Sequence, residues 1–303
     1  MLKSHEFEDQ NWGHCLALTN DQVELMIPFE FGPRILRYAI PGGTNPFAEF
    51  PAQRANSDQT KWHSYGGHRL WHAPEDIRRS YLPDNTPVTL EYFDSTLLAR
   101  QAIEPETHLQ KEMEIHLDPD NAQARIIHRI RNHSLFEIRL SLWAITVMQP
   151  GGRALLPLPP RGSHDGNLQA QTSLNLWAYT DLTDPRWRFG KSCISFDQDP
   201  SNSTAQKIGI SRHGGWLAYL NARQAFVKKC VFVENQPYPD QNSSLEIYAD
   251  HKCVELESLS PLTSLQPGAS AELIEDWLLI QNIEPASAEA QITQYLAPSV
   301  RQD

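Results

Sequence analysis

Two long segments of the chain alternate apolar and polar residues with a period of two. In THLQKEMEIHL, residues 107–117, every second position from Leu109 is apolar except Lys111, and the positions between are polar. FEIRLSLWAITVM, residues 136–148, begins with apolar residues on one face and with Glu137, Arg139, Ser141 and Trp143 on the other. Because successive side chains of a strand point to opposite sides, this pattern predicts β-strands that each pack one face against a core.

Short strands are predicted along most of the remaining chain, with turn-forming clusters between them. Strand candidates include QARIIHRIRN, SCISFDQ, QKIGISR and SLEIYAD, and the clusters include DPDN, QPGG and DPSNST. No long stretch repeats apolar residues at helical spacing, so we expect negligible helix. The predicted fold class is therefore all-β, as a large antiparallel sandwich or barrel.

The organisation along the chain favours one domain over residues 1–303. Hydrophobic residues make up 40% of the chain, which is enough for a full core. The Pro-rich segment RALLPLPPRGSHDGN, residues 153–167, is a long connection, and strand patterning resumes after it. Large all-β sandwiches of this length often form a single domain.

Charge and the distribution of cysteines exclude several classes of protein. The formal net charge is -11, from 26 Lys+Arg against 37 Asp+Glu, and such a surface repels nucleic-acid phosphates. No apolar run is long enough for a membrane span, and the start of the sequence has no hydrophobic signal region. The four cysteines are scattered without a CxxC pair, which is typical of free cytosolic thiols. We expect a cytoplasmic protein without nucleic-acid or membrane partners, of undetermined oligomeric state.

The segment CVELESLSP, residues 253–261, carries two glutamates on one face of a predicted strand. Alternation puts Glu255 and Glu257 on the same side, with Cα atoms roughly 6–7 Å apart. Like charges at that distance raise one pKa, which suits general acid–base chemistry. The alternative is a solvated sheet face with two unrelated glutamates.

The segment HSYGGHRLWHAPE, residues 63–75, gathers three histidines, an arginine and a tryptophan. His68 and His72 have the spacing of metal ligands on a helix, but Gly66, Gly67 and Pro74 favour a loop. No matching His or Cys pair occurs elsewhere, so we expect no metal ion. In a loop that lines a ligand pocket, the polar side chains would donate to hydroxyl groups and a tryptophan would stack on the ligand, with candidates His63, Arg69, Trp62 and Trp71. The alternative is a loop anchored by a buried Trp71.

Other candidate residues rest on weaker signals. Arg34 in GPRILRY is either a sheet-edge arginine or a ligand contact. Lys228 and Lys229 in FVKKCVF face opposite ways, so one of them points to the non-core face. The sequence contains no GxSxG elbow, P-loop, dinucleotide-binding glycine motif or HExxH motif, which excludes common nucleotide and hydrolase sites. We expect no cofactor.

Five segments in order resemble the galactose mutarotase-like family, and most closely its uncharacterised bacterial branch. They are FGPRILRYAIPGG, YGGHRLWHAPE, RIRNHSLFEIRLSLWAIT, YPDQNSSLEIYAD and VELESLSPLTSLQPGASAELIEDWLL. The similarity runs from about Gln22 to Ile280. It implies one large antiparallel β-supersandwich with a sugar-binding cleft on its concave face. It also implies an isomerase reaction, in which a glutamate removes the anomeric hydroxyl proton, a histidine protonates the ring oxygen, and the opened ring recloses as the other anomer.

The resemblance assigns roles to some residues and departs from the family at others. VELESLSP matches the segment that carries the family's basic glutamate, which favours Glu257 over Glu255 as the base. An assisting histidine of the family is replaced by Tyr65, so His63 or His68 would have to substitute. Aligning the strands puts Trp143 at the place of the acid histidine, where it can stack on a sugar but cannot deliver a proton. Arg34, Arg69, Trp71, Glu255 and Lys228 remain candidate sugar-binding residues.

Three functions follow from these residues. The first is an aldose epimerase-like enzyme with Glu257 as base and His68 or His72 as acid. The second is a carbohydrate-binding or sugar-sensing protein that kept the cleft and lost the acid. A glycoside hydrolase or lyase that uses Glu255 and Glu257 is less favoured, because hydrolytic carboxylates flank the scissile bond and these two stand side by side. For the first two, we expect His63, His68, Arg69, His72 and Glu257 to share one cleft.

Overall fold

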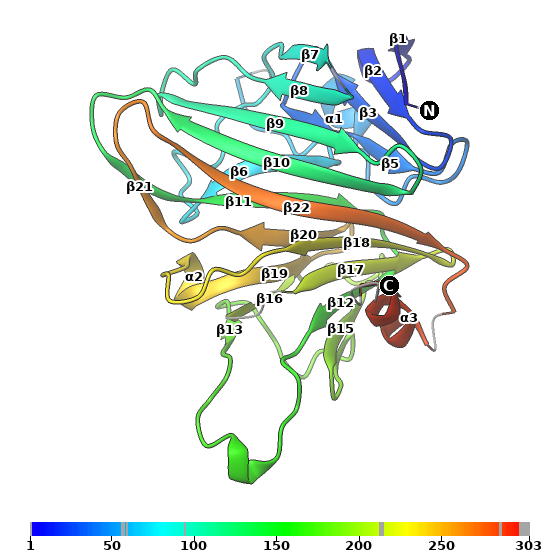
Figure 1. Ribbon diagram of the computed structural model, residues 1–303, viewed down its shortest axis with the longest axis vertical. Coiled ribbons are helices and arrows are strands. Elements are labelled where there is room, and N and C mark those ends of the chain that lie inside the picture. The colour runs from blue at the N-terminus through cyan, green and yellow to red at the C-terminus, as the bar shows by residue number, and fades with distance from the viewer. Residues whose placement is uncertain are drawn as a thin grey trace, which may run out of the picture.

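The computed structural model describes residues 2–55, 58, 60–93, 95–211, 215–284 and 287–296. Within these residues the strands form three antiparallel sheets (Figure 1). The four-stranded sheet has the order β1(Lys3–Asp9), β2(Gly13–Thr19), β3(Glu24–Pro28) and β5(Arg37–Ala39). The helices are short: α1(Pro51–Ala55), α2(Pro239–Asn242), α3(Ala288–Leu296) and the 3₁₀ turn η1(His164–Gly166).

Two large sheets carry most of the chain. The ten-stranded sheet has the order β14(Trp187–Phe189), β15(Cys193–Asp197), β12(Arg153–Pro157), β17(Trp216–Asn221), β18(Gln224–Cys230), β22(Ser270–Gln281), β10(Gln123–Asn132), β9(Leu109–Leu117), β8(Thr96–Arg100) and β7(Thr89–Phe93). The eight-stranded sheet has the order β13(Leu174–Leu176), β16(Gln206–Ser211), β19(Ser243–Ala249), β20(Val254–Leu259), β11(Ile138–Met148), β6(His68–Ala73) and β4(Arg34–Ile35), with β21(Thr263–Leu265) paired to β11.

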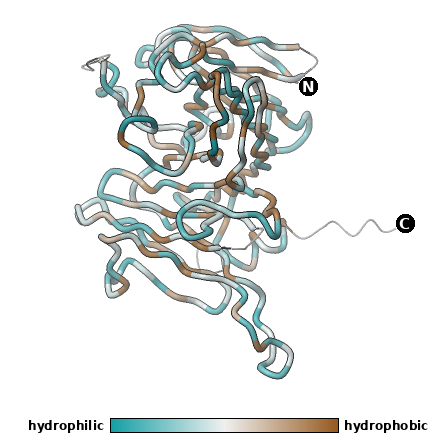
Figure 2. Tube along the Cα trace, turned by 90° about the vertical axis from the view of Figure 1, so that its left-hand side faces the viewer, coloured by the Kyte–Doolittle hydropathy of each residue, from teal (hydrophilic) through white to brown (hydrophobic). Residues whose placement is uncertain are grey.

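The main hydrophobic core lies where the two large sheets pack together. It joins Leu140 and Leu142 of β11 to Met113 and Ile115 of β9, all fully buried. Figure 2 shows hydrophobic segments concentrated in the body of the molecule and hydrophilic ones at many of its turns. The prediction of an all-β antiparallel sandwich is confirmed, with 48% of the described residues in strands and 7% in helices. None of the described helices is long and apolar enough to cross a membrane. The single-domain organisation stays a prediction.

The alternation in β9 is confirmed, and its interruption at Lys111 has a structural reason. The strand alternates buried and half-buried positions throughout, and Lys111 occupies a buried one. Its ammonium group lies 2.6 Å from Glu104. Burial alone would raise the pKa of the Glu104 carboxyl, but Lys111 outweighs it and holds that pKa at about 2. The buried lysine is therefore tolerated as half of an ion pair.

The long connection after β12 projects from the body and carries η1 at its tip (Figure 1). The expectation of a loop over residues 63–75, in contrast, is wrong for residues 68–73. These residues form β6, which pairs with β11 on one side and β4 on the other. All six are buried, so neither face shows the polar positions by which a half-buried strand is recognised.

Candidate functional site

The glycine pair before β6 sets where this strand begins. Gly66 and Gly67 both adopt positive φ, 88° and 67°. A Cβ atom on Gly66 would lie 2.0 Å from the carbonyl oxygen of Ala48, and one on Gly67 would lie 2.5 Å from that of Ile35. Only glycine fits these positions, because a side chain would collide with backbone that cannot move aside. The turn therefore fixes the register of β6 against β11.

We expect Gly66→Ala to lower the free energy of unfolding by about 1–3 kcal/mol, since it adds a backbone clash to the cost of a positive φ. Gly42→Ala is the matched control, because Gly42 has a φ of 69° and open space around its Cβ position. Urea denaturation of the two variants separates the clash from the dihedral cost. Equal losses would show that the close approach to Ala48 has no energetic consequence.

Because β6 alternates, its side chains divide between two environments. His68, Leu70 and His72 point away from the face that carries Arg69 and Trp71. Arg69 and Trp71 line a cavity of about 510 Å³ on the outer face of the eight-stranded sheet. Five strands contribute to its wall, with Arg69 and Trp71 from β6, Trp143 from β11, Lys207 from β16, Tyr248 from β19, and Glu255 and Glu257 from β20. Loop residues complete it, among them Trp62, His63, Ser64, Glu75, Tyr81, Tyr179 and Asp250.

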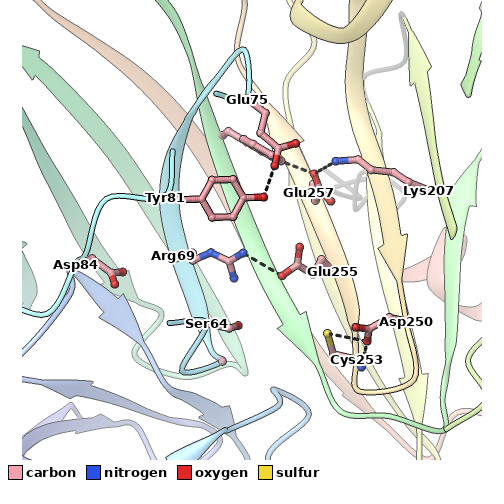
Figure 3. A network of polar contacts seen from close by, with 12 residues as sticks. Ser64, Arg69, Glu75, Tyr81, Asp84, Lys207, Asp250, Cys253, Glu255 and Glu257 are labelled. Atoms are coloured by element: carbon pink, nitrogen blue, oxygen red, sulfur yellow. Dashed lines mark hydrogen bonds and ion pairs between the residues drawn. The ribbon is translucent and has the colours of Figure 1, made fainter. Parts of the chain in front are cut away.

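Glu257 is a fully buried carboxylate in the wall of this cavity. Its Oε2 accepts hydrogen bonds from Trp143 Nε1 at 2.7 Å and from Lys207 Nζ at 2.8 Å, the second of which is drawn in Figure 3. Its Oε1 is also buried and has no hydrogen-bond donor. Burial raises the pKa of the Glu257 carboxyl above its ordinary value, while the Lys207 charge opposes that shift. Glu257 thus has one oxygen held in place and one free to accept a proton.

Lys207 is a site residue that sequence reasoning missed. Its ammonium group lies 2.8 Å from both Glu246 and Glu257, and it also sits over the rings of Trp143 and Trp177, at 4.9 and 4.7 Å. Burial lowers the pKa of the Lys207 ammonium, but the two carboxylates outweigh burial and raise that pKa well above its ordinary value. Lys207 therefore remains a cation at the wall of the cavity.

Arg69 forms a second charged group in the same cavity. Its Nη2 donates to Glu255 at 3.0 Å (Figure 3). Its guanidinium also lies over the rings of Trp71 at 4.7 Å and Trp62 at 5.4 Å. Nε and Nη1 of Arg69 and Nε1 of Trp62 are buried without acceptors. Buried donors without partners are rare in folded proteins. This part of the wall is therefore able to donate to oxygen atoms of a ligand.

Aromatic rings form much of the remaining wall. Trp62, Trp71 and Tyr81 contact one another edge to face, with centroids 5.0–5.3 Å apart, and Trp71 contacts Trp143 at 5.4 Å. The Tyr81 hydroxyl donates to Glu75 at 2.5 Å. Burial, together with that bond to Glu75, raises the pKa of the Tyr81 phenol. The cavity thus combines apolar ring faces with charged groups that point inward.

Of the candidate residues predicted from sequence, seven line this cavity. They are Trp62, His63, Arg69, Trp71, Trp143, Glu255 and Glu257. The His63 ring is half-buried, and its Nε2 lies 3.2 Å from the carbonyl oxygen of Asp58. Alternation in β20 places the two glutamates on one side, as expected.

The prediction that His68 and His72 share this cavity is wrong, because the even positions of β6 face the core. His68 is fully buried, with Nδ1 2.8 Å from Thr146 Oγ1 and Nε2 2.7 Å from His128 Nε2. His72 is also buried, and neither of its ring nitrogens has a hydrogen-bond partner. Burial, helped by the Lys111 charge, lowers the pKa of His72 to about 4. Neither histidine can reach a ligand in the cavity.

The contacts of His68 define its protonation. His128 Nδ1 lies 3.0 Å from the Leu273 carbonyl, which only accepts, so this nitrogen carries a proton. Neutral His128 then accepts at Nε2 from His68 Nε2–H, and His68 Nδ1 accepts from the Thr146 hydroxyl. Burial lowers the pKa of both histidines, in line with neutral rings. The ligand atoms of His68, His128 and Glu275 lie within 4.8 Å of one another, a spacing that could hold a metal ion. In this structure, however, every ring nitrogen of the two histidines takes part in the hydrogen-bond chain.

Arg34 and Lys228 also lie outside the cavity, which corrects their placement in the cleft. Arg34 is fully buried, donates to the carbonyls of Ser64 and Gly66, and pairs with Asp84 at 2.5 Å, so it braces the turn before β6. Lys228 is buried between the sheets against Glu275 at 3.0 Å. The other lysine, Lys229, is exposed. Neither lysine reaches the cavity, because β18 belongs to the ten-stranded sheet.

Comparison with known proteins adds information at the level of structure. No protein-family model matches the chain, and no functionally curated protein matches its sequence. A solved structure from Klebsiella pneumoniae, described as a candidate aldose 1-epimerase, is 13% identical, with a TM-score of 0.63 over 97% of this chain and 86% of that one. A galactose mutarotase-like protein from Lactobacillus casei is 11% identical, with a TM-score of 0.55 over 88% of this chain and 100% of that one.

A third structure, from Escherichia coli K12, is also described as a candidate aldose 1-epimerase. It is 9% identical, with a TM-score of 0.56 over 92% of this chain and 100% of that one. At these identities the likeness concerns the path of the backbone and not the side chains of a site. The chain therefore has the fold of the galactose mutarotase-like proteins.

Proposed function

We propose that the cavity on the eight-stranded sheet binds a sugar, and that Glu257 is the base in the interconversion of aldose anomers. The observation that carries this proposal is the unpartnered Oε1 of Glu257 in the wall of an aromatic cavity. The structures that share the fold include candidate aldose 1-epimerases and galactose mutarotase-like proteins.

The lining of the cavity suits a sugar for a chemical reason. A pyranose ring presents C–H groups on its faces and hydroxyl groups around its edge. Trp62, Trp71 and Trp143 offer apolar ring faces, and the buried donors of Arg69 and Trp62 offer hydrogen bonds to hydroxyl oxygens. The carboxylate of Glu257 accepts from a hydroxyl.

The proposed reaction needs one proton acceptor and one proton donor. Glu257 takes the proton of the anomeric hydroxyl, the bond between C1 and the ring oxygen breaks as the carbonyl forms, and the ring oxygen takes up a proton. Rotation about C1–C2 and the reverse steps give the other anomer. The side chains in the cavity that carry a transferable proton include His63, Tyr179 and Tyr248. Burial raises the pKa of the Tyr179 phenol to about 12, so this group stays protonated at neutral pH.

A second function, sugar binding without catalysis, is favoured by one observation. Trp143, which the sequence alignment puts at the place of the family's acid histidine, donates to Glu257 and carries no transferable proton of suitable pKa. In such a protein the Glu257 carboxylate would orient a hydroxyl group without removing its proton. Turnover experiments distinguish the two functions. A hydrolase is less favoured, because Arg69 and Lys207 hold Glu255 and Glu257 side by side on one strand.

The sugar-binding part of the proposal is tested with Trp62, which is half-buried and belongs to a loop. We expect Trp62→Ala to weaken the binding of an aldose about three- to tenfold, because a stacked aromatic contact contributes about 0.5–1.5 kcal/mol. Ligand-observed NMR with a panel of aldohexoses, aldopentoses and their phosphates measures this. Tyr92→Ala, an exposed aromatic residue on β7, is the control and should bind like wild type. Absence of binding across the whole panel by the wild-type protein would refute the proposal.

A further inference from the structure

Glu246 lies next to the proposed base but does not line the cavity. It is directly opposite Glu257 in the antiparallel pairing of β19 and β20. Lys207 Nζ lies 2.8 Å from an oxygen of each glutamate. Both glutamates are 0% exposed and Lys207 is 4% exposed. One buried ammonium group thus bridges two buried carboxyl groups.

The charges of this cluster do not balance if both glutamates are ionised. One cation and two carboxylates leave a net negative charge away from water, and like charges directly opposite each other in a sheet are destabilising. The other ionisable groups that face the cluster do not help. Asp240 acts to raise the pKa of the Glu246 carboxyl, Glu255 does the same to Glu257, and Tyr179 stays a neutral phenol. A single proton on one glutamate makes the cluster neutral.

The hydrogen bonds decide which glutamate takes that proton. Glu257 receives two donors, Trp143 Nε1 and Lys207 Nζ. Glu246 shares Lys207 with Glu257 at 2.8 Å, but neither of its oxygens receives a further donor comparable to Trp143 Nε1. Donors stabilise a carboxylate, and a buried carboxylate without them is costly. The proton therefore belongs on Glu246.

We propose that Glu246 is a neutral carboxylic acid in the folded protein and that it acts as a positioning residue for Glu257. With Glu246 neutral, the Lys207 charge stabilises the Glu257 carboxylate alone. Glu257 is then ionised and fixed at Oε2 while Oε1 stays free. The protonation of Glu246 stands on its own geometry, whereas its role in preparing a base rests on the proposed function.

The expected pH dependence follows from the same contacts. Burial raises the pKa of the Glu246 carboxyl well above its ordinary value; Lys207 opposes this, and the charges of Glu257 and Asp240 add to it. The folded protein then holds a proton that the unfolded chain releases above the ordinary pKa of glutamate, about 4.3. Stability from this group is complete below that pH and falls as pH rises toward the raised folded-state pKa.

Carbon-detected NMR of protein labelled at the glutamate side chains tests the protonation directly. At pH 7 the carboxyl carbon assigned to Glu246 through its own side-chain carbons should have the chemical shift of a protonated acid. That of Glu257 should have the shift of a carboxylate. The proposal is overturned if no glutamate shows the acid form, or if the acid form is assigned to Glu257. Neither chemical shift is measured with a sugar present, so the result is independent of whether the protein turns over any aldose.

A second measurement compares wild type with Glu246→Gln, which keeps the shape of a neutral acid. Above about pH 5, and as far as the raised folded-state pKa of Glu246, the ratio of the unfolding equilibrium constant of wild type to that of the variant should rise about tenfold per pH unit. This is the signature of one additional proton released on unfolding. The control is Glu272→Gln, a carboxylate on β22 that is paired with Arg129 at the surface, and it should keep the wild-type slope. Parallel slopes for wild type and Glu246→Gln would contradict a protonated Glu246. If the variant fails to fold, the NMR assignment on wild type still decides.

Discussion

Replacing Glu257 with glutamine should slow the interconversion of aldose anomers by roughly two to four orders of magnitude, the usual contribution of a general base. Glutamine keeps the size of the side chain and accepts from Trp143 and Lys207, but it cannot take a proton. Binding of the same sugar should persist, because the aromatic wall and the Arg69 donors are unchanged. Polarimetry or NMR measures the rate, and ligand-observed NMR measures the binding.

Glu255→Gln is the matched control for this prediction. Glu255 lies on the same strand face, but Arg69 holds its carboxylate at 3.0 Å. Its replacement should weaken sugar binding more than it lowers the rate at saturating sugar. The assignment of the base to Glu257 fails if Glu257→Gln turns over at the wild-type rate, or if the two variants lose activity equally.

Replacing Lys228 with methionine should lower the free energy of unfolding by about 3–5 kcal/mol, because it leaves a buried charge without its partner. Lys228 and Glu275 are both fully buried, 3.0 Å apart. Burial would raise the pKa of the Glu275 carboxyl, but the Lys228 charge and the hydrogen bond from Trp277 outweigh burial and lower it. The stabilisation from Glu275 is therefore present above the ordinary pKa of glutamate and is lost as pH falls through the depressed value.

Lys229→Met on the same strand is the matched control. Lys229 is exposed, so its loss should change stability by no more than about 0.5 kcal/mol. Urea denaturation of both variants at neutral pH gives the comparison. Adding Glu275→Gln to Lys228→Met should recover much of the lost stability, because the uncompensated charge is then removed. Similar stabilities for the two single lysine variants would show that the pair is not an energetically important part of the core.

Strands in which polar and apolar residues alternate could be predicted from the sequence, and strands without that alternation could not. β9 and β20 show polar and apolar residues in alternation, so the faces of Glu255 and Glu257 were predicted correctly. β6 is covered on both sides, by the core on one and by the aromatic residues of the cavity on the other. Because β6 contains two buried histidines and a buried arginine, its sequence is polar, and a polar segment is typical of a loop. The glycine pair added to that impression, although it marks the turn before the strand.

Contacts between distant strands account for what the sequence did not reveal at the site. The segments that carry Lys207 and Glu246 were predicted as strands, but nothing in either segment indicates that β19 pairs with β20 on one side and with β16 on the other. His128 and Lys228 belong to the ten-stranded sheet, and only the packing of the two sheets brings them to His68. A local pattern gives the face of a residue, whereas its partner depends on the order of strands in the sheet.

Interconversion of sugar anomers in the cavity around Glu257 is the activity that we propose. Its most direct test is exchange NMR of wild-type protein with a panel of neutral and phosphorylated aldoses, in which magnetisation transfer between α and β anomers reports the rate. We predict that at least one sugar exchanges faster with the protein than without it, and that Glu257→Gln abolishes this gain. A protein that binds a sugar of the panel but leaves every anomerisation rate at its spontaneous value would contradict the claim and identify a sugar-binding protein instead.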